Sequence, residues 1–492
     1  VWAGSNDGLV HVTRNGGESW TNVTENIPDL PPLGTVSNIE PSRHQAGAAY
    51  ISVDFHQVNN TDPYAYKTED YGESWALVSG DIPRSVFSYV HVIREDPVRP
   101  GLLYLGTENS LYVSFDDGRS WAPLQTNLPH APVHWLTIQD HFNDLVVGTY
   151  GRGFWILDDI TPLQQLDRDV LAASTHLFDP RPAYRFRNKE GRVSQPEDPG
   201  AGHNPQYGAS IHYYVGEESE SGTEAGADRG ILLSILDSKG AVVRDLGRVP
   251  SGPGLHRVFW NLRYESSSTP RLRTRVLEHS HVPLGEDGWR PAGDGGRVTP
   301  LAPPGQYTVR LEVGGIEHET PLTVLKDPSS AGSETDIQAQ HQVILQLRTE
   351  AEAVVDLIND AEWIRAQVVD LRELLGSREG MEEVLAAGEE LDRALIELEM
   401  GLTDLRLSGG SAGQDALRWP RQLYAKLTSL AGYIGSSDFR PTTQQMEVHK
   451  RLQGLLRNAQ ERMEAIRGDE LAELNRLLRE RSVPNIVGKV GS

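Results

Sequence analysis

The chain has 492 residues, which is too long for one hydrophobic core and predicts about two to four domains. It holds 46 Lys and Arg against 69 Asp and Glu, and the formal net charge of −23 disfavours a nucleic-acid partner, whose phosphates require basic side chains. The absence of cysteine excludes disulfide and thiolate chemistry, and no apolar run approaches the roughly 18 residues of a membrane span.

The chain begins inside a strand-like segment. Val1 opens the stretch VWAGSNDGLVHV, with no initiator methionine and no signal peptide in view. Because this stretch falls in the middle of a repeated unit, we expect the chain to be the C-terminal part of a longer protein, with any export signal on the preceding part.

A short pattern occurs three times in the N-terminal region, as TRNGGESW (13–20), TEDYGESW (68–75) and SFDDGRSW (114–121). Each copy has a hydroxyl residue, then Asn or Asp, then Gly, and ends in Ser-Trp. A spacing of roughly 40–50 residues suits a four-stranded propeller blade. The shared positions are Asn15, Gly17 and Trp20; Asp70, Gly72 and Trp75; and Asp116, Gly118 and Trp121.

We interpret the pattern as a tight turn rather than as a reactive carboxylate site, which is the alternative. Glycine adopts positive φ at low cost, Asp or Asn accepts backbone N–H bonds, and the Trp ring packs between sheets. Asn15 favours the turn, because an amide can cap a turn but cannot act as a general base.

The three copies resemble the Asp-box, or bacterial neuraminidase (BNR) repeat, of sialidases, sortilin-type propellers and some xyloglucan hydrolases. The resemblance implies that residues 1–163 form about three and a half blades of a β-propeller. In those families the box lies opposite the central site, so it implies a fold more than an activity. Preceding blades, or a partner chain, would then cover the open sheet edges.

The clearest blade runs from Val90 to Leu124, with VHVI, LLYLGT, SLYVSF and WAPL as its strands. Loops between second and third strands then meet at the end opposite the box. The catalytic candidates in these loops are Asp7, Asp62 and Glu108, and the ligand-binding candidates are Asn6, His56, Asn60, Asn109, Tyr150 and Arg152. Glycoside hydrolysis needs two facing carboxyl groups, whereas the alternative is that these are solvated turn residues.

Residues 172–328 predict a second all-β unit, an immunoglobulin-like sandwich with a long loop at 265–299. The stretches NPQYGASIHYYV, ILDSKGAVVRDL and PPGQYTVRLEV resemble the module that follows the propeller in large bacterial BNR-repeat proteins, which is similar to the immunoglobulin-like domain of flagellar hook-capping proteins. His279 and His281 lie in the loop without an evident third ligand, so we predict no metal site and no cofactor.

Residues 333–482 predict an α-helical hairpin or bundle, because Ile337, Ile344, Ala351 and Ile358 recur every seven residues. Further helices are expected at about 381–405, 415–434 and 442–481, with a loose tail at 483–492. The apolar stripes suit a core, and a dimer seam or a dock for the propeller are the alternatives.

Two functions follow from these resemblances. The first is a glycosyl-hydrolase-like propeller protein, secreted or periplasmic, that acts on or binds extracellular glycans. The second is a noncatalytic, sortilin-like binding head for a peptide or glycan. Neither requires a nucleic acid or a membrane span, and either is compatible with a homo-oligomer built through the helices.

Overall fold

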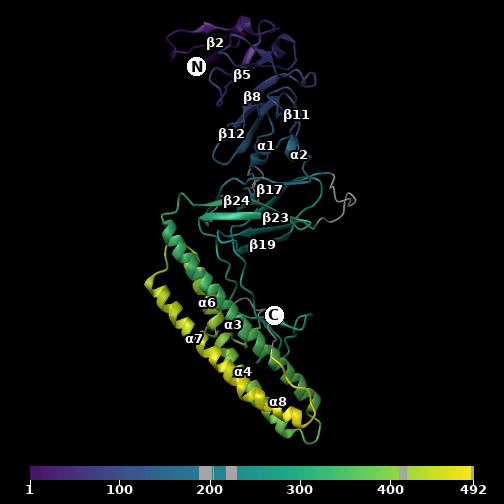
Figure 1. Ribbon diagram of the computed structural model, residues 1–492, viewed down its shortest axis with the longest axis vertical. Coiled ribbons are helices and arrows are strands. Elements are labelled where there is room, and N and C mark those ends of the chain that lie inside the picture. The colour runs from purple at the N-terminus through teal and green to yellow at the C-terminus, as the bar shows by residue number, and fades with distance from the viewer. Residues whose placement is uncertain (188–201, 203, 218–229, 409–417, 489–492) are drawn as a thin grey trace.

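The structure is a computed structural model that describes residues 1–187, 202, 204–217, 230–408 and 418–488. Strands come first and long helices follow, so the predicted order of mainly β and then α is confirmed. Figure 1 shows three parts in succession along the long axis: strands β1–β14 at one end, β15–β20 with β23 and β24 in the middle, and helices α3–α8 at the other end. None of the helices in the described ranges combines the length and apolar character needed to cross a bilayer.

Four antiparallel sheets, called the repeated sheets below, follow one another in the N-terminal part. Two have four strands in chain order: β4 (Thr35–Pro41), β5 (Ala49–Asp54), β6 (Tyr64–Thr68) and β7 (Ala76–Leu77); then β8 (Val90–Glu95), β9 (Leu103–Thr107), β10 (Leu111–Ser114) and β11 (Ala122–Pro123). Two have three strands: β1 (Trp2–Gly4), β2 (Val10–Val12) and β3 (Thr21–Asn22); and β12 (Val133–Gln139), β13 (Asp144–Thr149) and β14 (Phe154–Leu157). The four strands predicted between Val90 and Leu124 are therefore confirmed. Short 3-10 turns lie at Thr24–Asn26 and His56–Val58.

Neighbouring repeated sheets share apolar cores. Trp75 packs with residues of the first and second sheets, and Trp121 with residues of the second and third. Both indoles are buried, as expected for a ring held between sheets. Trp20 differs, because its residue is 45% exposed; it precedes the outer strand β3, and no described sheet covers it. The expectation of a buried ring is therefore wrong at Trp20.

The three repeated turns join the third strand of a sheet to its fourth strand, or β2 to β3 in the first sheet. Asp70 accepts hydrogen bonds from Thr68 Oγ1 at 2.9 Å and from the Ser74 amide and hydroxyl at 2.8 and 2.6 Å. The Ser74 bonds lower the pKa of Asp70. Asp116 and Asn15 make corresponding bonds within their own turns. These side-chain oxygens are occupied by the turns themselves, and the turn glycines have positive φ: Gly17, Gly72 and Gly118.

Two short helices, α1 (Thr161–Gln165) and α2 (Arg168–Ala172), lead into the middle part, which holds two packed sheets. One sheet has the order β15 (Thr175–Leu177), β17 (Ala209–Val215), β20 (Gly254–Trp260). The other has the order β16 (Ala183–Arg185), β24 (Ile316–Lys326), β23 (Gly305–Val313), β18 (Leu232–Leu236), β19 (Val242–Arg248). The inward residues alternate with outward ones, and the fully buried Trp260 lies in their common core.

The segment at 265–299 is more than the predicted loop. It forms a small hairpin-like pair, β21 (Arg271–Leu272) and β22 (Arg290–Pro291), which packs against the helices. The buried carboxylate of Glu362 accepts hydrogen bonds from the amide and hydroxyl of Thr274 at 2.6 and 2.7 Å. The sequence predicted a long loop, but some of its polar groups, including Thr274 and Arg290, are buried and hydrogen-bonded.

The helical part contains α3 (Glu334–Leu375), α4 (Glu382–Leu402), α6 (Leu423–Gly435), α7 (Thr443–Gly468) and α8 (Glu470–Glu480). Ser333 caps α3 by accepting the amide of Asp336. The helix expected at 415–434 is interrupted at Pro420: Arg418 is helical, α6 begins at Leu423, and residues 415–417 lie outside the described ranges. The helix expected at 442–481 divides at Asp469. The tail is not loose up to Val487, whose amide bonds Gln367, and Ile486 is buried.

Candidate functional site

The first strand of three repeated sheets carries one extra residue that has no partner in the adjacent strand. Pairing skips Ser37 between Val36 and Asn38 in β4, His91 between Val90 and Val92 in β8, and His134 between Val133 and Trp135 in β12. Such bulges turn a side chain away from its regular direction and are common beside active sites. The same local distortion therefore recurs at three corresponding positions, and two of the extra residues are histidines.

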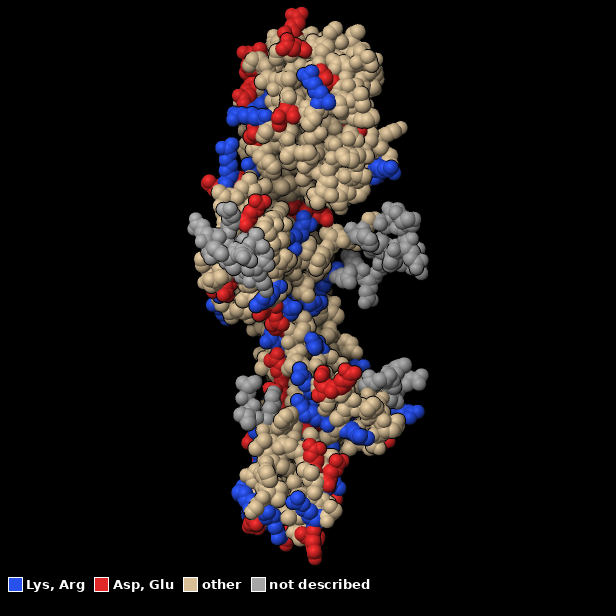
Figure 2. All heavy atoms as spheres, turned by 90° about the vertical axis from the view of Figure 1, so that its right-hand side faces the viewer, with Lys and Arg blue, Asp and Glu red and all other residues tan. Residues whose placement is uncertain are grey.

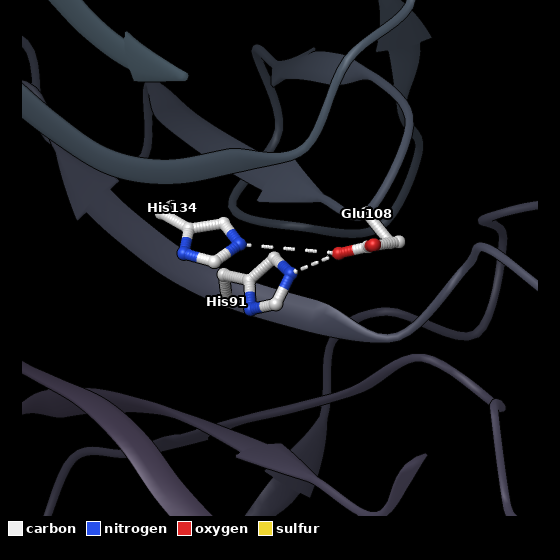
Figure 3. Close-up of side chains that lie close together, drawn as sticks. All are labelled: His91, Glu108 and His134. Carbon is white, nitrogen blue, oxygen red and sulfur yellow. Dashed lines mark hydrogen bonds and ion pairs between the residues drawn. The ribbon is translucent and has the colours of Figure 1, made fainter. Parts of the chain in front are cut away.

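The two bulged histidines converge on one carboxylate (Figure 3). His91 Nε2 lies 2.8 Å from Glu108 Oε2, and His134 Nε2 lies 3.9 Å from the same oxygen. Glu108 comes from the turn between β9 and β10. The His91 and Glu108 side chains are 13% and 24% exposed, whereas the His134 side chain is 47% exposed, so the cluster opens to solvent on the His134 side.

A row of rings, called the ring row below, passes through this cluster. His56 stacks on Tyr89 with ring centroids 4.9 Å apart, and Tyr89 meets His91 edge-on at 5.2 Å. His91 lies 4.1 Å from His134, which stacks on Tyr150 at 5.4 Å. The five rings come from three repeated sheets, so the packing of the sheets holds the row together.

Two carboxylates border the ring row. Burial and a hydrogen bond to Glu108 raise the pKa of the Tyr89 hydroxyl, with the charge of Asp54 adding to the effect. Asp54 Oδ2 also lies 2.6 Å from His56 Nδ1. Burial and the neighbouring His91 lower the pKa of His134, which favours its neutral imidazole. The site thus combines neutral donors, carboxylate acceptors and ring faces.

Three of the residues expected from sequence belong to this site, namely Glu108, His56 and Tyr150. Asn109 is adjacent, with its side-chain nitrogen 3.3 Å from His130 Nδ1. Asn6 and Asp7 lie in the turn between β1 and β2, where the Asn6 carbonyl accepts from Thr35 at 3.2 Å.

The remaining expected residues serve local contacts. Asp62 pairs with Arg84 at 2.9 Å, and Asn60 accepts the Asp62 amide at 3.0 Å. The Arg152 carbonyl accepts from the Trp155 indole at 3.0 Å. In the described part of the chain, no hydrogen bond or ion pair joins these residues to Glu108.

Sequence reasoning missed Tyr89, His91 and His134. A usable signal was present, because the pair Val-His occurs at 90–91 and again at 133–134, at the same position of two first strands. The strand pattern alone gives no reason to expect the bulges that turn both imidazoles toward Glu108.

No protein-family model matches the chain, and no curated protein is a significant match. The similar solved structures include a GH74 xyloglucanase from Xanthomonas campestris, 16% identical over 64% of this chain and 58% of that one, with a TM-score of 0.25. A GH74 enzyme from Niastella koreensis is 9% identical over 65% of this chain and 43% of that one, with a TM-score of 0.26. An ancestral GH74 enzyme is 15% identical over 30% of this chain and 22% of that one, with a TM-score of 0.21.

The chain thus spans between 22% and 58% of the lengths of these solved structures. At such low TM-scores the similarity assigns neither a fold nor an activity to the chain.

Proposed function

We propose that the ring row binds a glycan. The observation that carries this proposal is the continuous contact of five rings, His56 to Tyr150, around the Glu108 carboxylate. A sugar ring has an apolar C–H face that packs on an aromatic ring, and hydroxyl groups that bond to carboxylates and imidazoles. Tyr150 is 74% exposed, so one end of the row is open for such stacking.

The charge distribution favours a neutral glycan over an anionic one. The chain has a net charge of −23, and among the expected site residues only Arg152 is cationic. A carboxylated sugar would need a bidentate guanidinium partner, and Arg152 is the single candidate in that set. Figure 2 shows a broad area of uncharged side chains over one side of the repeated sheets, which is compatible with an uncharged ligand.

Replacing Tyr150 with alanine is expected to weaken glycan binding about fivefold, because one stacking contact contributes roughly 1 kcal/mol. The measurement is the dissociation constant for a panel of neutral oligosaccharides, beginning with β-glucans. Tyr433→Ala is the matched control, since Tyr433 is 67% exposed on the distant helix α6 and should leave affinity unchanged. Equal affinity of wild type and Tyr150→Ala for every bound oligosaccharide would refute this site.

Hydrolysis of the bound glycan is the second candidate function. It is favoured by two carboxylates, Glu108 and Asp54, which both raise the pKa of the neighbouring Tyr89. Glu108→Gln keeps the shape of the side chain but removes its acid–base chemistry. Release of reducing ends is then expected to fall by about 10²- to 10⁴-fold with little loss of binding. Asp54→Asn tests the second carboxylate in the same assay. Asp7→Asn and Asp62→Asn test the two other carboxylates that the sequence singled out. Undiminished release by Glu108→Gln would remove Glu108 from the mechanism.

We propose on the same basis that the repeated sheets are Asp-box propeller blades and that the middle part is an immunoglobulin-like sandwich. The serial antiparallel sheets, their recurring turns and the two packed sheets support this. A glycan substrate of this kind suits a secreted or periplasmic location. A peptide remains the alternative ligand for a sortilin-like binding head, and the Tyr150 variant tests it with peptides in place of sugars.

A further inference from the structure

We infer that His91, Glu108 and His134 form a binding site for one divalent transition-metal ion, of which Zn²⁺ is the representative. One ligand atom from each residue lies within 4.8 Å of the other two. Both imidazole Nε2 atoms point toward Glu108 Oε2, as Figure 3 shows. This inference goes beyond glycan binding, because the ion would bind whether or not a sugar is present.

Two of the three spacings between the ligand atoms are close to those expected around an ion. Ligand atoms around a tetrahedral Zn²⁺, with bonds of about 2.0–2.1 Å, are about 3.4 Å apart. The distance from Glu108 Oε2 to His91 Nε2 is 2.8 Å, and that to His134 Nε2 is 3.9 Å. Each distance thus differs from the ideal value by about 0.5 Å. A change of that size needs only small side-chain rotations, because His134 is partly exposed.

An ordinary ion pair does not account for all three residues. His91 and Glu108 already satisfy one another at hydrogen-bond distance. His134 adds a second imidazole that lies too far from Glu108 for a hydrogen bond, and its ring makes no hydrogen bond to any other described residue. A cation between the three atoms would use both imidazole lone pairs and the carboxylate charge together.

The donor set selects the class of ion. Imidazole nitrogen suits zinc, iron, cobalt and copper, whereas calcium and magnesium prefer oxygen ligands. Two histidines and one glutamate also match sites that keep a coordination position open. The solvent-exposed side of His134 leaves room for that position next to Tyr150, so water or a ligand hydroxyl on the ring row would have access to the ion.

The bulges supply an independent reason. A regular strand would carry His91 and His134 through the sheet at fixed alternation, but an extra residue is inserted at both positions. The insertions direct two imidazoles from different sheets to one point. In β4 the corresponding extra residue is Ser37, whose hydroxyl bonds Ser52 at 2.8 Å and the Val90 carbonyl at 3.2 Å, so that bulge serves a contact between sheets.

The test is a calorimetric titration of ZnCl₂ into the chelator-treated full chain without any glycan. One high-affinity ion per chain is expected for the wild type. His134→Gln and His91→Ala should each weaken binding by about 100-fold or more, since even the loss of a supporting contact around a metal costs 10- to 100-fold. His134 is exposed enough for its variant to fold, and circular dichroism checks both variants. Co²⁺ should give visible absorption bands typical of nitrogen and oxygen ligands, and these should disappear in the same variants.

His279→Ala is the matched control, because His279 and His281 form a close histidine pair away from this cluster and should not affect the tight site. Absence of tight Zn²⁺ binding in the wild type would overturn the inference. Equal binding by the wild type and the folded His134→Gln variant would overturn it as well. Tyr150→Ala should retain Zn²⁺ binding, so failure of the metal site and failure of glycan binding are separately visible.

Discussion

Replacing Arg365 with methionine is expected to destabilise the helical part by about 3–5 kcal/mol, since the change leaves buried carboxylates without their cation. Arg365 is 3% exposed on α3, and Glu362 and Glu399 are fully buried. Its guanidinium donates to Glu399 at 2.8 Å and to Glu362 at 3.0 Å. A third acid, Asp392, accepts from Nε at 2.9 Å. Methionine would fill the volume but would satisfy none of these oxygens.

Three carboxyl groups surround the single guanidinium of Arg365, so removal of one of them makes a second informative variant. Burial, and then the charge of Glu362, raise the pKa of Glu399 well above its usual range. Glu399→Gln removes a carboxyl that is already costly to ionise, so it should be nearly neutral or mildly stabilising. In the Glu399→Gln background, Arg365→Met should cost less than in the wild type, because fewer carboxyl groups lose their partner.

The measurement is urea unfolding followed by circular dichroism of the helices. Arg372→Met is the matched control, since Arg372 lies on the same helix and pairs with Glu389 at 2.9 Å with both side chains exposed. That substitution should change the unfolding free energy by less than about 1 kcal/mol. If Arg365→Met were no more destabilising than Arg372→Met, the buried network would not contribute to stability as argued.

Much of the fold could be predicted from local patterns. The seven-residue recurrence from Ile337 gives the long helix α3, and the alternation around Leu233 gives strand β18. The packing of segment 265–299 against the helices could not, because it depends on contacts with distant residues, such as Thr274 with Glu362, which no local period encodes.

The candidate site was predictable only in part, for a related reason. Loop positions in repeated units led to Glu108, His56 and Tyr150, because turns at one end of stacked sheets come together. Asp62 lies in a corresponding loop but pairs with Arg84 instead. His91 and His134 lie within strands, where the alternation of apolar residues predicts only an ordinary outward side chain. Their meeting depends on two bulges and on the packing of two sheets, neither of which is visible in a short stretch of sequence.

Acidification from pH 6.5 to 4 is expected to destabilise the junction between the repeated sheets and the middle part, with His212 contributing about 3 kcal/mol. His212 is 3% exposed on β17 and accepts the Arg257 Nε–H at its Nε2, 2.8 Å away. Burial, partly offset by Asp159 and reinforced by Arg257 and Arg181, lowers its pKa from 6.5 to about 4. Protonation would make Nε2 a donor facing another donor.

The lowered pKa of His212 determines the direction in which the free energy of unfolding changes with pH. Between pH 6.5 and 4 the unfolded chain binds a proton at His212 that the folded chain refuses, so stability is highest above pH 6.5 and falls as the pH falls toward 4. Burial also lowers the pKa of His341 to about 4, so His341 adds to the loss of stability over the same pH range. The histidine contribution to the slope is then at most about 2.7 kcal/mol per pH unit for the two groups together.

His212→Gln should remove about half of that slope, because glutamine can accept the Arg257 N–H but cannot gain a proton. The measurement is the unfolding free energy at a series of pH values from 7 to 4. His281→Gln, at an exposed imidazole, should leave the wild-type slope unchanged. Parallel curves for wild type and His212→Gln would mean that His212 binds its proton equally in both states. A shallower curve for His212→Gln alone would show that a single neutral imidazole between Asp159 and Arg257 makes the junction sensitive to acid.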